Sequence, residues 1–444
     1  MDCLIVRDAR SFRNLHSPRL TQLTLLVGEN SSGKSTLLAL TRIAWDLAFA
    51  TTEPNFNEEP FSLGAFDDIA HYHGGQGKRA KSFEVGFSQR LPSQSRQTGT
   101  RDPITVKGTF TASAGQPALT SLRVESGPWS VTAHKTGPSI RLELTTPGKD
   151  FEFSSHFQLE YLNPRAIFYL LDPLRFLNAR GTQRELFEGT LPTEKQSDRL
   201  LKVLALFRPT RARAASPWGR PLATAPIRTQ PKRTYDPVQE ARSPEGGHVP
   251  MLLARLNSTA PDQWKELETE LAIYGKASGL FEDLFVRRFT KSESAPFQLR
   301  VKLSRQKKEV NLLDVGYGVS QVLPMLVEPL NEPEPAMFLL QQPEVHLHPR
   351  AQAELGTFLT SMVARRNHRF LVETHSDHII DRVRLAVRDG VLPSHAVNVL
   401  YLDRSGGDTQ VFSLGVDSDG NLVSPPDDYR TFFLEEELRL IGAT

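Results

Sequence analysis

The chain has 444 residues, which is enough for two to three domain-sized units. Its 53 basic and 51 acidic residues leave a formal net charge of +2, so the overall charge does not indicate a nucleic-acid partner. The lone Cys3 excludes an internal disulfide framework and a cysteine metal cluster, and it fits a reducing compartment. No apolar run is long enough to span a membrane and no export signal is evident, so we expect a cytoplasmic protein.

A short apolar strand, a glycine-containing loop and an amphipathic helix follow one another near the N-terminus. Between the expected strand at 23–27 and the expected helix at 37–48, residues 28–35 read GENSSGKS and match G-x-x-x-x-G-K-[ST]. In such a loop, backbone N–H groups and the helix dipole hold phosphates. Lys34 would reach the β- and γ-phosphates, and Ser35 would ligate Mg²⁺. The sequence therefore predicts a site for a nucleoside triphosphate.

The next regions differ in their predicted secondary structure. Alternating strand-like segments separated by turn residues predict an antiparallel sheet at 82–89, 104–112, 120–126, 129–134, 140–145 and 151–156. Helices are expected in the proline-rich part, at 183–187, 197–207, 251–256, 262–274 and 278–288. Strands are then expected at 298–303, 310–313, 337–340, 369–372, 397–402 and 409–414, and helices at 318–327, 350–363, 376–387 and 430–440.

A strongly basic stretch lies in the proline-rich part. Between Asp198 and Asp236 there are nine basic residues and no acidic one. One interpretation is a surface for the phosphates of a nucleic acid or a nucleotide. The other is a solvated loop whose charges are balanced by acidic residues elsewhere in the fold. The sequence leaves both open.

Polar blocks follow the later strands or open the later helices. Residues 314–321 place glycines and a Ser-Gln pair before a helix, which is typical of an anion-binding helix N-terminus. Residues 341–344 and 373–376 follow two buried strands, where an open α/β sheet places ligand-contacting groups. A zinc site is the alternative use of these blocks, since their side chains include zinc-binding types: His346, His348, His375, Asp377 and His378.

Taken in order, these blocks resemble the ABC-type ATPases, especially the branch with structural-maintenance-of-chromosomes and overcoming-lysogenization-defect proteins. They are most similar to bacterial AAA family ATPases of anti-phage defence operons. The blocks are GENSSGKST (28–36), DVGYGVSQVLP (314–324), LLQQPEVHLHP (339–349) and ETHSDHII (373–380), with weaker likeness at 225–235 and 422–429.

The resemblance implies an α/β fold: an ABC-type P-loop ATPase head with an antiparallel β lobe and an inserted, mostly helical region. The expected units are an N-terminal ATPase lobe at 1–158, the inserted region at 159–296, a C-terminal ATPase lobe at 297–415 and a tail at 416–444. It also implies a homodimer or larger homo-oligomer with ATP and Mg²⁺ between protomers. The residues it assigns to ATP are Gly28, Asn30, Ser31, Ser32, Gly33, Lys34, Ser35 and Thr36, and, from the partner's signature turn, Gly318, Ser320 and Gln321.

The chain departs from the pattern of this family where ATP is hydrolysed. The acid that holds Mg²⁺ and the glutamate that activates water are replaced by Gln341 and Gln342, and Tyr317 replaces the usual signature serine. A glutamine can orient water or ligate Mg²⁺ weakly, but it cannot accept a proton at neutral pH. Glu344 is then the first candidate base and Glu373 the second, with His375 as the residue that senses the γ-phosphate. We therefore expect slow hydrolysis.

Three functions are compatible with these features. The first is an ATPase whose nucleotide-dependent dimerisation controls DNA or a separate effector, a nuclease or a toxin, in anti-phage defence. The second is an ATP-locked scaffold that sequesters such an effector with little hydrolysis, as the two glutamines suggest. The third is a DNA-repair ATPase head, which the lack of long heptad-patterned segments disfavours.

Overall fold

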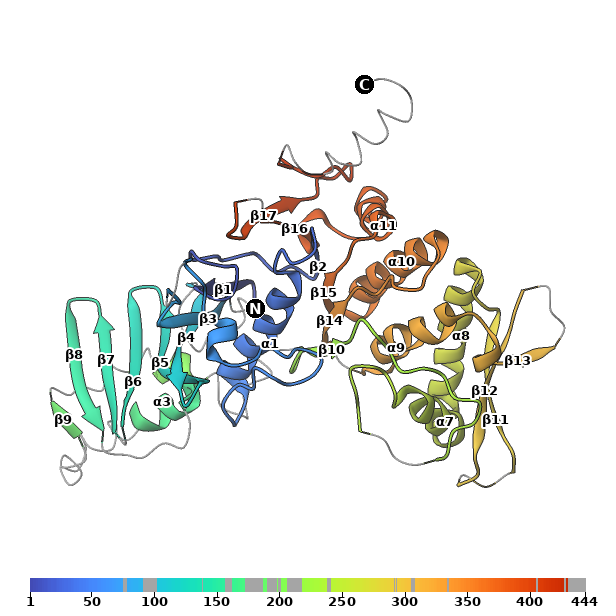
Figure 1. Ribbon diagram of the computed structural model, residues 1–444, viewed down its shortest axis with the longest axis horizontal. Coiled ribbons are helices and arrows are strands. Elements are labelled where there is room, and N and C mark those ends of the chain that lie inside the picture. Colours follow the sequence, from blue (N-terminus) through green and yellow to red (C-terminus); the bar gives the residue numbers. More distant parts are fainter. Residues whose placement is uncertain are drawn as a thin grey trace, which may run out of the picture.

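A six-stranded, mostly parallel sheet forms the centre of the computed structural model (Figure 1). The structure describes residues 1–74, 78–90, 102–137, 139–155, 162–171, 187–189, 198, 201–205, 218–237, 241–290, 292, 294–304, 308–333, 335–404, 406–426 and 429. The strand order is β10-β14-β15-β2-β16-β17, and only the β16–β17 pair is antiparallel. These strands are β10 (Leu222–Thr224), β14 (Met337–Gln341), β15 (Arg369–Glu373), β2 (Leu23–Gly28), β16 (Val397–Asp403) and β17 (Gln410–Gly415).

The central sheet is buried on both faces, which explains why its strands are continuous apolar runs. Leu339 and Leu371 point into one hydrophobic core, and their neighbours Phe338 and Phe370 point into the other. The helices around the sheet are α1 (Lys34–Phe49), α7 (Val249–Thr259), α8 (Pro261–Ser278), α9 (Tyr317–Asn331), α10 (Pro349–Arg366) and α11 (Asp377–Arg388). Helix α1 belongs to the first core and helices α7–α11 to the second.

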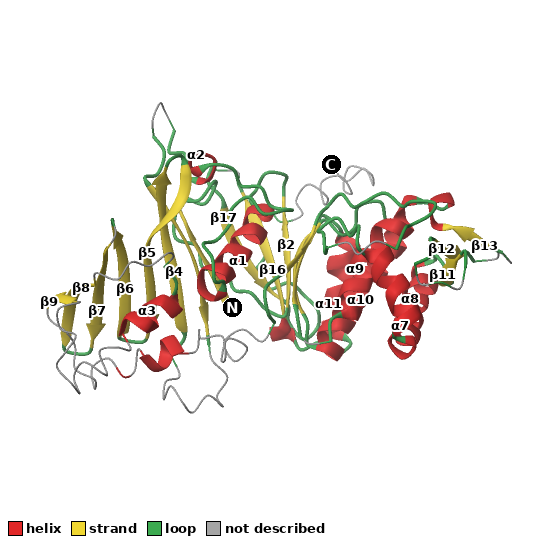
Figure 2. Ribbon diagram, turned by 90° about the horizontal axis from the view of Figure 1, so that it is seen from below, coloured by secondary structure: helices red, strands yellow, loops and turns green. Residues whose placement is uncertain are grey.

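An eight-stranded antiparallel sheet forms a second lobe beside α1 (Figures 1 and 2). Its order is β1-β3-β4-β5-β6-β7-β8-β9. The strands are β1 (Cys3–Arg7), β3 (Ser82–Gln89), β4 (Ile104–Ser113), β5 (Gln116–Ser126), β6 (Trp129–Thr136), β7 (Ser139–Thr146), β8 (Lys149–Ser155) and β9 (Phe187–Gly189), with α2 (Phe66–Ile69) and α3 (Pro164–Leu171) nearby. The expected antiparallel sheet is confirmed, and its alternating side chains bury one face on α1.

A small antiparallel sheet, β11-β12-β13, lies on the far side of helices α7–α10 (Figure 2). Its strands are β11 (Asp283–Arg288), β12 (Phe297–Lys302) and β13 (Glu309–Asn311), and two short 3-10 turns span Leu312–Asp314 and Ser394–Ala396. The prediction of a helix at 278–288 is wrong. Helix α8 ends at Ser278 because Gly279 adopts a left-handed C-cap, φ 77°, and the following residues alternate as a strand.

The region expected to be mostly helical also contributes to the central sheet. Strand β10 pairs with β14 through residues 222–224, an arrangement that the sequence did not predict. Of the helix expected at 197–207, residues 198 and 201–204 are helical. Of the helix expected at 183–187, only Phe187 is among the described residues, and it begins β9. The helix expected at 430–440 lies outside the described residues. Among the described helices, none is long and apolar enough to cross a membrane.

Arg220, which lies just before β10, connects this strand to helix α1 through ion pairs. The Arg220 guanidinium donates to both carboxylate oxygens of buried Asp46 at 2.7 Å and to Glu58 at 2.8 and 2.5 Å. Arg220→Met would leave Asp46 without this compensation, so we expect a loss of about 1–3 kcal/mol of unfolding free energy, measured by urea denaturation. Arg388→Met, which removes an exposed pair with Asp389, is the control and should cost less than about 1 kcal/mol. Equal losses in both variants would contradict the prediction.

Candidate nucleotide-binding site

The loop predicted to bind phosphate connects β2 to α1 as expected. Gly28 and Gly33 have φ values of 140° and 103°, where side chains are strained. A Cβ at Gly28 would also lie 2.2 Å from the carbonyl oxygen of Leu402, so only glycine fits there. Lys34 Nζ folds back over the loop and donates to the carbonyl oxygens of Gly28 at 2.9 Å and Glu29 at 2.6 Å. The loop thus holds its lysine at the start of a 16-residue helix, where the dipole favours anions.

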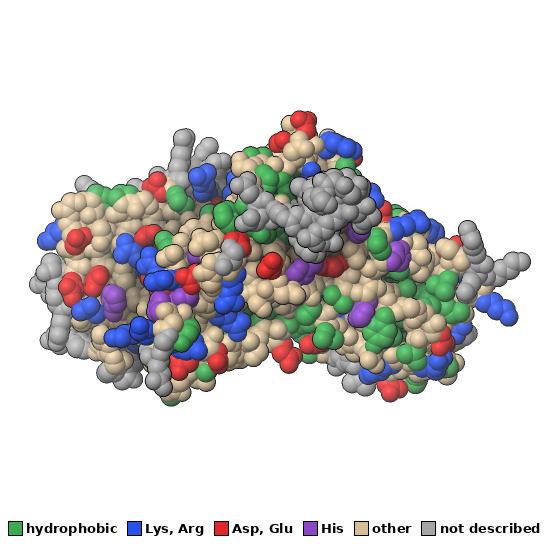
Figure 3. All heavy atoms as spheres, turned by 45° about the horizontal axis from the view of Figure 1, so that its top comes forward, with side chains coloured by type: hydrophobic (Ala, Val, Ile, Leu, Met, Phe, Trp, Pro, Cys, Tyr) green, Lys and Arg blue, Asp and Glu red, His purple; other side chains and the backbone are tan. Residues whose placement is uncertain are grey.

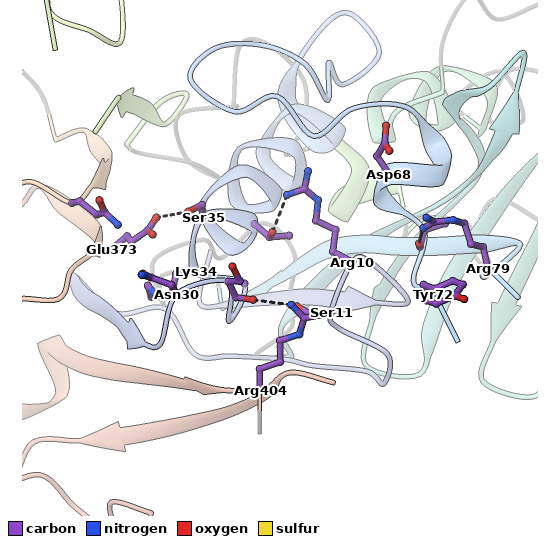
Figure 4. Close-up of a pocket in the computed structure, with 15 residues that line it drawn as sticks. Arg10, Ser11, Asn30, Lys34, Ser35, Asp68, Tyr72, Arg79, Glu373 and Arg404 are labelled. Carbon is purple, nitrogen blue, oxygen red and sulfur yellow. Dashed lines mark hydrogen bonds between the residues drawn. The ribbon is translucent and has the colours of Figure 1, made fainter. Parts of the chain in front are cut away.

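A cavity of about 570 Å³ opens in front of this loop (Figure 4). Seven of the site residues predicted from the sequence line it: Asn30, Ser31, Gly33, Lys34, Ser35, Thr36 and Gln342. Glu373, the second candidate base, also lines the cavity. The sequence did not predict the remaining lining residues, which are Arg10, Ser11, Asp68, Ala70, Tyr72, Arg79 and Arg404. Gly28 and Ser32 belong to the loop but do not line the cavity. The volume is in the range of small-molecule sites.

Glu373 is the carboxylate that faces the phosphate loop. It stands at the end of β15, between β2 and β14 in the parallel sheet, where it is opposite Gln341. The hydroxyl of Ser35 donates to Glu373 Oε2 at 2.7 Å. Burial raises the pKa of the Glu373 carboxyl, while the Ser35 hydrogen bond and the charge of Lys34 oppose that rise. A carboxylate therefore lies next to Ser35, although the neighbouring strand ends in glutamine.

The turn after β14 places one glutamine at the cavity and directs Glu344 elsewhere. Gln342 lines the cavity, has a positive φ of 41° and donates its N–H to the carbonyl oxygen of Glu373 at 2.8 Å. Glu344 Oε1 accepts the N–H of His375 at 2.6 Å, and Oε2 is shielded from solvent without a hydrogen-bond partner among the described residues. Burial raises the pKa of Glu344. Glu344, Gln341 and the exposed His375 do not line the cavity.

A buried arginine lies behind this turn. Arg228 is 3% exposed, and its Nη2 donates to the carbonyl oxygens of Gln341 and Gln342, both at 3.3 Å. Its Nε and Nη1 have no hydrogen-bond partner among the described residues. Burial lowers the pKa of Arg228 to about 10, and the nearby Glu344 charge opposes this. The sequence indicated Arg228 only as one member of the basic stretch.

The signature turn does not reach the phosphate loop within one chain. Gly318, Ser320 and Gln321 lie in the first turns of α9 and line no part of the cavity at the loop. Ser320 Oγ donates to the carbonyl oxygen of Tyr317 at 2.9 Å. A Cβ at Gly318 would lie 2.9 Å from the carbonyl oxygen of His346, so the turn packs closely on the loop after β14. Within one chain, the signature turn therefore contributes no residue to the cavity at the phosphate loop.

The zinc alternative has no support in the described part of the chain. Nowhere in it do three His, Cys, Asp or Glu side chains converge as metal ligands would. His348 instead caps helix α10 by accepting the N–H of Ala351 at 3.4 Å, and His346 packs against the ring of Tyr317. These two histidines are explained by local structure.

Most of the basic residues that the structure describes in this stretch make internal contacts, while Lys232 is exposed. Lys202 pairs with Asp198, Arg220 with Asp46 and Glu58, and Arg233 with Asp314, while Arg228 is buried. On the face shown in Figure 3, basic and acidic side chains are interspersed. The described members of the stretch therefore favour the interpretation in which acidic residues elsewhere in the fold balance the charges.

These features define a site of the P-loop ATPase type: a phosphate loop between a buried parallel strand and a helix, with a carboxylate on the adjacent strand. Residues 281–381, less than a quarter of the chain, match the family model described as "AAA domain, putative AbiEii toxin, Type IV TA system". The match covers the signature turn and both strand-end blocks but not the phosphate loop. No curated protein matches the sequence.

Solved structures with a similar arrangement are Smc head domains. One, bound to the C-winged helix domain of ScpA, has 12% identity and a TM-score of 0.43, covering 94% of this chain and 98% of that one. One derived from Pyrococcus furiosus has 9% identity and a TM-score of 0.41, with 99% of both chains covered. One from Thermotoga maritima has 12% identity and a TM-score of 0.35, covering 94% and 100%.

Proposed function

We propose that this protein is an ABC-type ATPase that binds ATP and hydrolyses it slowly. The observation that carries the proposal is the cavity at the phosphate loop, where Lys34, Ser35 and Glu373 meet and the Ser35 hydroxyl lies 2.7 Å from the carboxylate. Lys34 binds the β- and γ-phosphates once ATP replaces the two backbone carbonyls that it now contacts. The glycine backbone and the N-terminus of α1 hold the remaining phosphate oxygens.

The residues at the loop fit Mg²⁺, which prefers oxygen ligands and accompanies nucleotide phosphates. Ser35 and Glu373 would hold it, with the amide oxygen of Gln341 as a weaker ligand on the adjacent strand. When bound, Mg²⁺ neutralises charge on the phosphate oxygens. In this proposal Glu373 supplies the negative charge that Gln341 lacks.

Slow hydrolysis follows from the residue that faces the cavity after β14. The Gln342 amide can orient a water molecule toward the γ-phosphate but cannot take its proton. Glu344, the first candidate base from the sequence, accepts a hydrogen bond from the His375 N–H and lies outside the cavity lining. We therefore assign Glu344 a positioning role on the 373–376 turn.

A second copy of the chain would complete the site with Gly318, Ser320 and Gln321 on the γ-phosphate. The signature turn lies outside the cavity of its own chain, which supports this arrangement. ATP would then control a homodimer or larger homo-oligomer, and through it a separate toxin or nuclease, or DNA. An association with anti-phage defence is part of this proposal, and a toxin as the separate effector agrees with the description of the matched family model, which names a putative toxin of a type IV TA system.

ATP binding and turnover by the purified protein with Mg²⁺ test the proposal. We expect Lys34→Ala to weaken ATP binding at least about tenfold, since a hydrogen bond to a charged group contributes about 1.5–3 kcal/mol. The control is Lys276→Ala, which changes a lysine whose side chain is 61% exposed and outside the cavity. Calorimetry measures binding, and phosphate release measures turnover. Absence of ATP binding by the wild-type protein would overturn the proposal.

An ATP-locked scaffold is the second candidate, and the glutamines at 341 and 342 favour it. Both functions predict ATP binding that depends on Lys34. They differ in turnover: the scaffold predicts tight binding with no phosphate release, alone or with its partner. Multiple turnovers by the isolated protein would exclude the scaffold.

A further inference from the structure

The end of the cavity away from Glu373 is lined by a group of side chains that the phosphates leave unused. Tyr72, Arg79 and Asp68 form this end, Arg10 lies between them and the loop, and Ser35 and Glu373 mark the opposite end (Figure 4). Because Lys34 and Ser35 take the β- and γ-phosphates and their metal, the nucleoside of a bound triphosphate extends toward the other end. That end is where Tyr72 lies.

Tyr72 is exposed and yet held in place. Tyr72 is 53% exposed, and the Arg79 guanidinium lies 5.5 Å from the centroid of the Tyr72 ring. A β-bridge joins the backbones of Tyr72 and Arg79, and the N–H of His71 donates to the carbonyl oxygen of Asp8 at 2.8 Å. The His71 ring is 3% exposed and contacts the carbonyl oxygen of Arg10 at 2.6 Å. The Tyr72 ring is therefore accessible, while the backbone on either side of it is held by these contacts.

The segment that carries Tyr72 is also connected to the phosphate loop. Arg10 has a left-handed φ of 50°, and its N–H donates to the carbonyl oxygen of Ile69 at 2.6 Å. Its side chain reaches Thr36 Oγ1 at 3.5 Å and the carbonyl oxygen of Leu63 at 3.0 Å. Asp68 uses Oδ2 to accept the N–H of Ala65 at 2.8 Å, and its carboxylate is an acceptor at the cavity wall. An aromatic face, cations and an acceptor thus share one end of the cavity.

We propose that Tyr72 is the stacking platform for the base of a nucleoside triphosphate, with Arg79 beside the ring and Asp68 accepting a hydrogen bond from the nucleoside. This inference rests on the proposed function, because it requires the phosphates at Lys34. Stacking uses the π-face that every base has, so an exposed ring beside an arginine suits this ligand.

The test compares ATP with inorganic tripolyphosphate, which has the phosphates but no base, by calorimetry in Mg²⁺. We expect Tyr72→Ala to weaken ATP binding about five- to 150-fold, the range for stacking one base on one aromatic ring, and to leave tripolyphosphate binding unchanged. Tyr72→Phe should retain ATP affinity. Phe289→Ala removes a ring that is 61% exposed and lies outside the cavity, and it is the control that should bind both ligands as the wild type does.

Two results would overturn the platform while leaving the phosphate loop in place: Tyr72→Ala binding ATP as tightly as the wild type, or wild-type protein binding ATP no more tightly than tripolyphosphate. Equal weakening of both ligands by Tyr72→Ala would also overturn it, since the residue would then act on the loop structure. A wild-type protein that binds neither ligand would contradict the proposed function itself, and the platform with it.

Discussion

Glu373→Gln is expected to lower Mg²⁺-dependent ATP turnover about 100-fold or more, because a metal at such a site stabilises the transition state by several kcal/mol. The substitution keeps the shape of the side chain and removes the only carboxylate in contact with Ser35 among the described residues. With Gln341 beside it, the metal would have no charged protein ligand. Phosphate release over a range of Mg²⁺ concentrations measures the effect, and partial recovery at high Mg²⁺ would support a role in metal binding.

Glu344→Gln is the matched control, since it makes the same chemical change three residues after Gln341. If Glu344 is the general base, as the sequence first suggested, its loss should cost about 10²–10⁴-fold in turnover. The contact of Glu344 with the His375 N–H and its position outside the cavity lining predict a smaller loss. If turnover fell more in Glu344→Gln than in Glu373→Gln, Glu344 would be the general base, and our assignment of a positioning role to it would be wrong.

The sequence predicted those parts of the fold that depend on local patterns. Apolar runs such as 337–340 are buried on both faces of the sheet, and the loop at 28–35 is fixed by glycines that no other residue could replace. The segment 278–288 was misassigned because its apolar residues fit either period, and Gly279 decided between helix and strand.

The parts of the site that the sequence did not predict depend on contacts between distant segments. Ser35 and Glu373 are 338 residues apart, and only the strand order places them side by side. Arg228 looked like surface charge because its burial follows from β10 joining the sheet beside β14. Tyr72 had no recognisable motif. Residue types and spacing predicted the phosphate-binding loop, while the sheet topology determined which carboxylate faces that loop.

Arg228→Met is expected to lower the unfolding free energy by about 1–3 kcal/mol, because the buried carbonyl oxygens of Gln341 and Gln342 lose their charged donor. Arg228 is 3% exposed and donates to the Gln341 and Gln342 carbonyl oxygens, and its charge, like that of Lys34, acts on Glu344. Without it, two carbonyl oxygens lose their donor, and the shielded Oε2 of Glu344 loses one of the two cations, Arg228 and Lys34, that act on this carboxylate. Chemical denaturation measures the loss, and Arg255→Met, at an exposed position on α7, is the control.

A double-mutant cycle separates the contribution of charge from that of packing. If Arg228 mainly compensates Glu344, then Glu344→Gln in the Arg228→Met background should recover about 1–3 kcal/mol relative to the sum of the single variants. If Arg228 mainly supports the 341–342 turn, the two effects should add, and ATP turnover should fall in Arg228→Met even where the protein remains folded. Stability unchanged in Arg228→Met would contradict both, because a buried guanidinium with two unpaired nitrogens would then be replaceable by an apolar side chain at no cost.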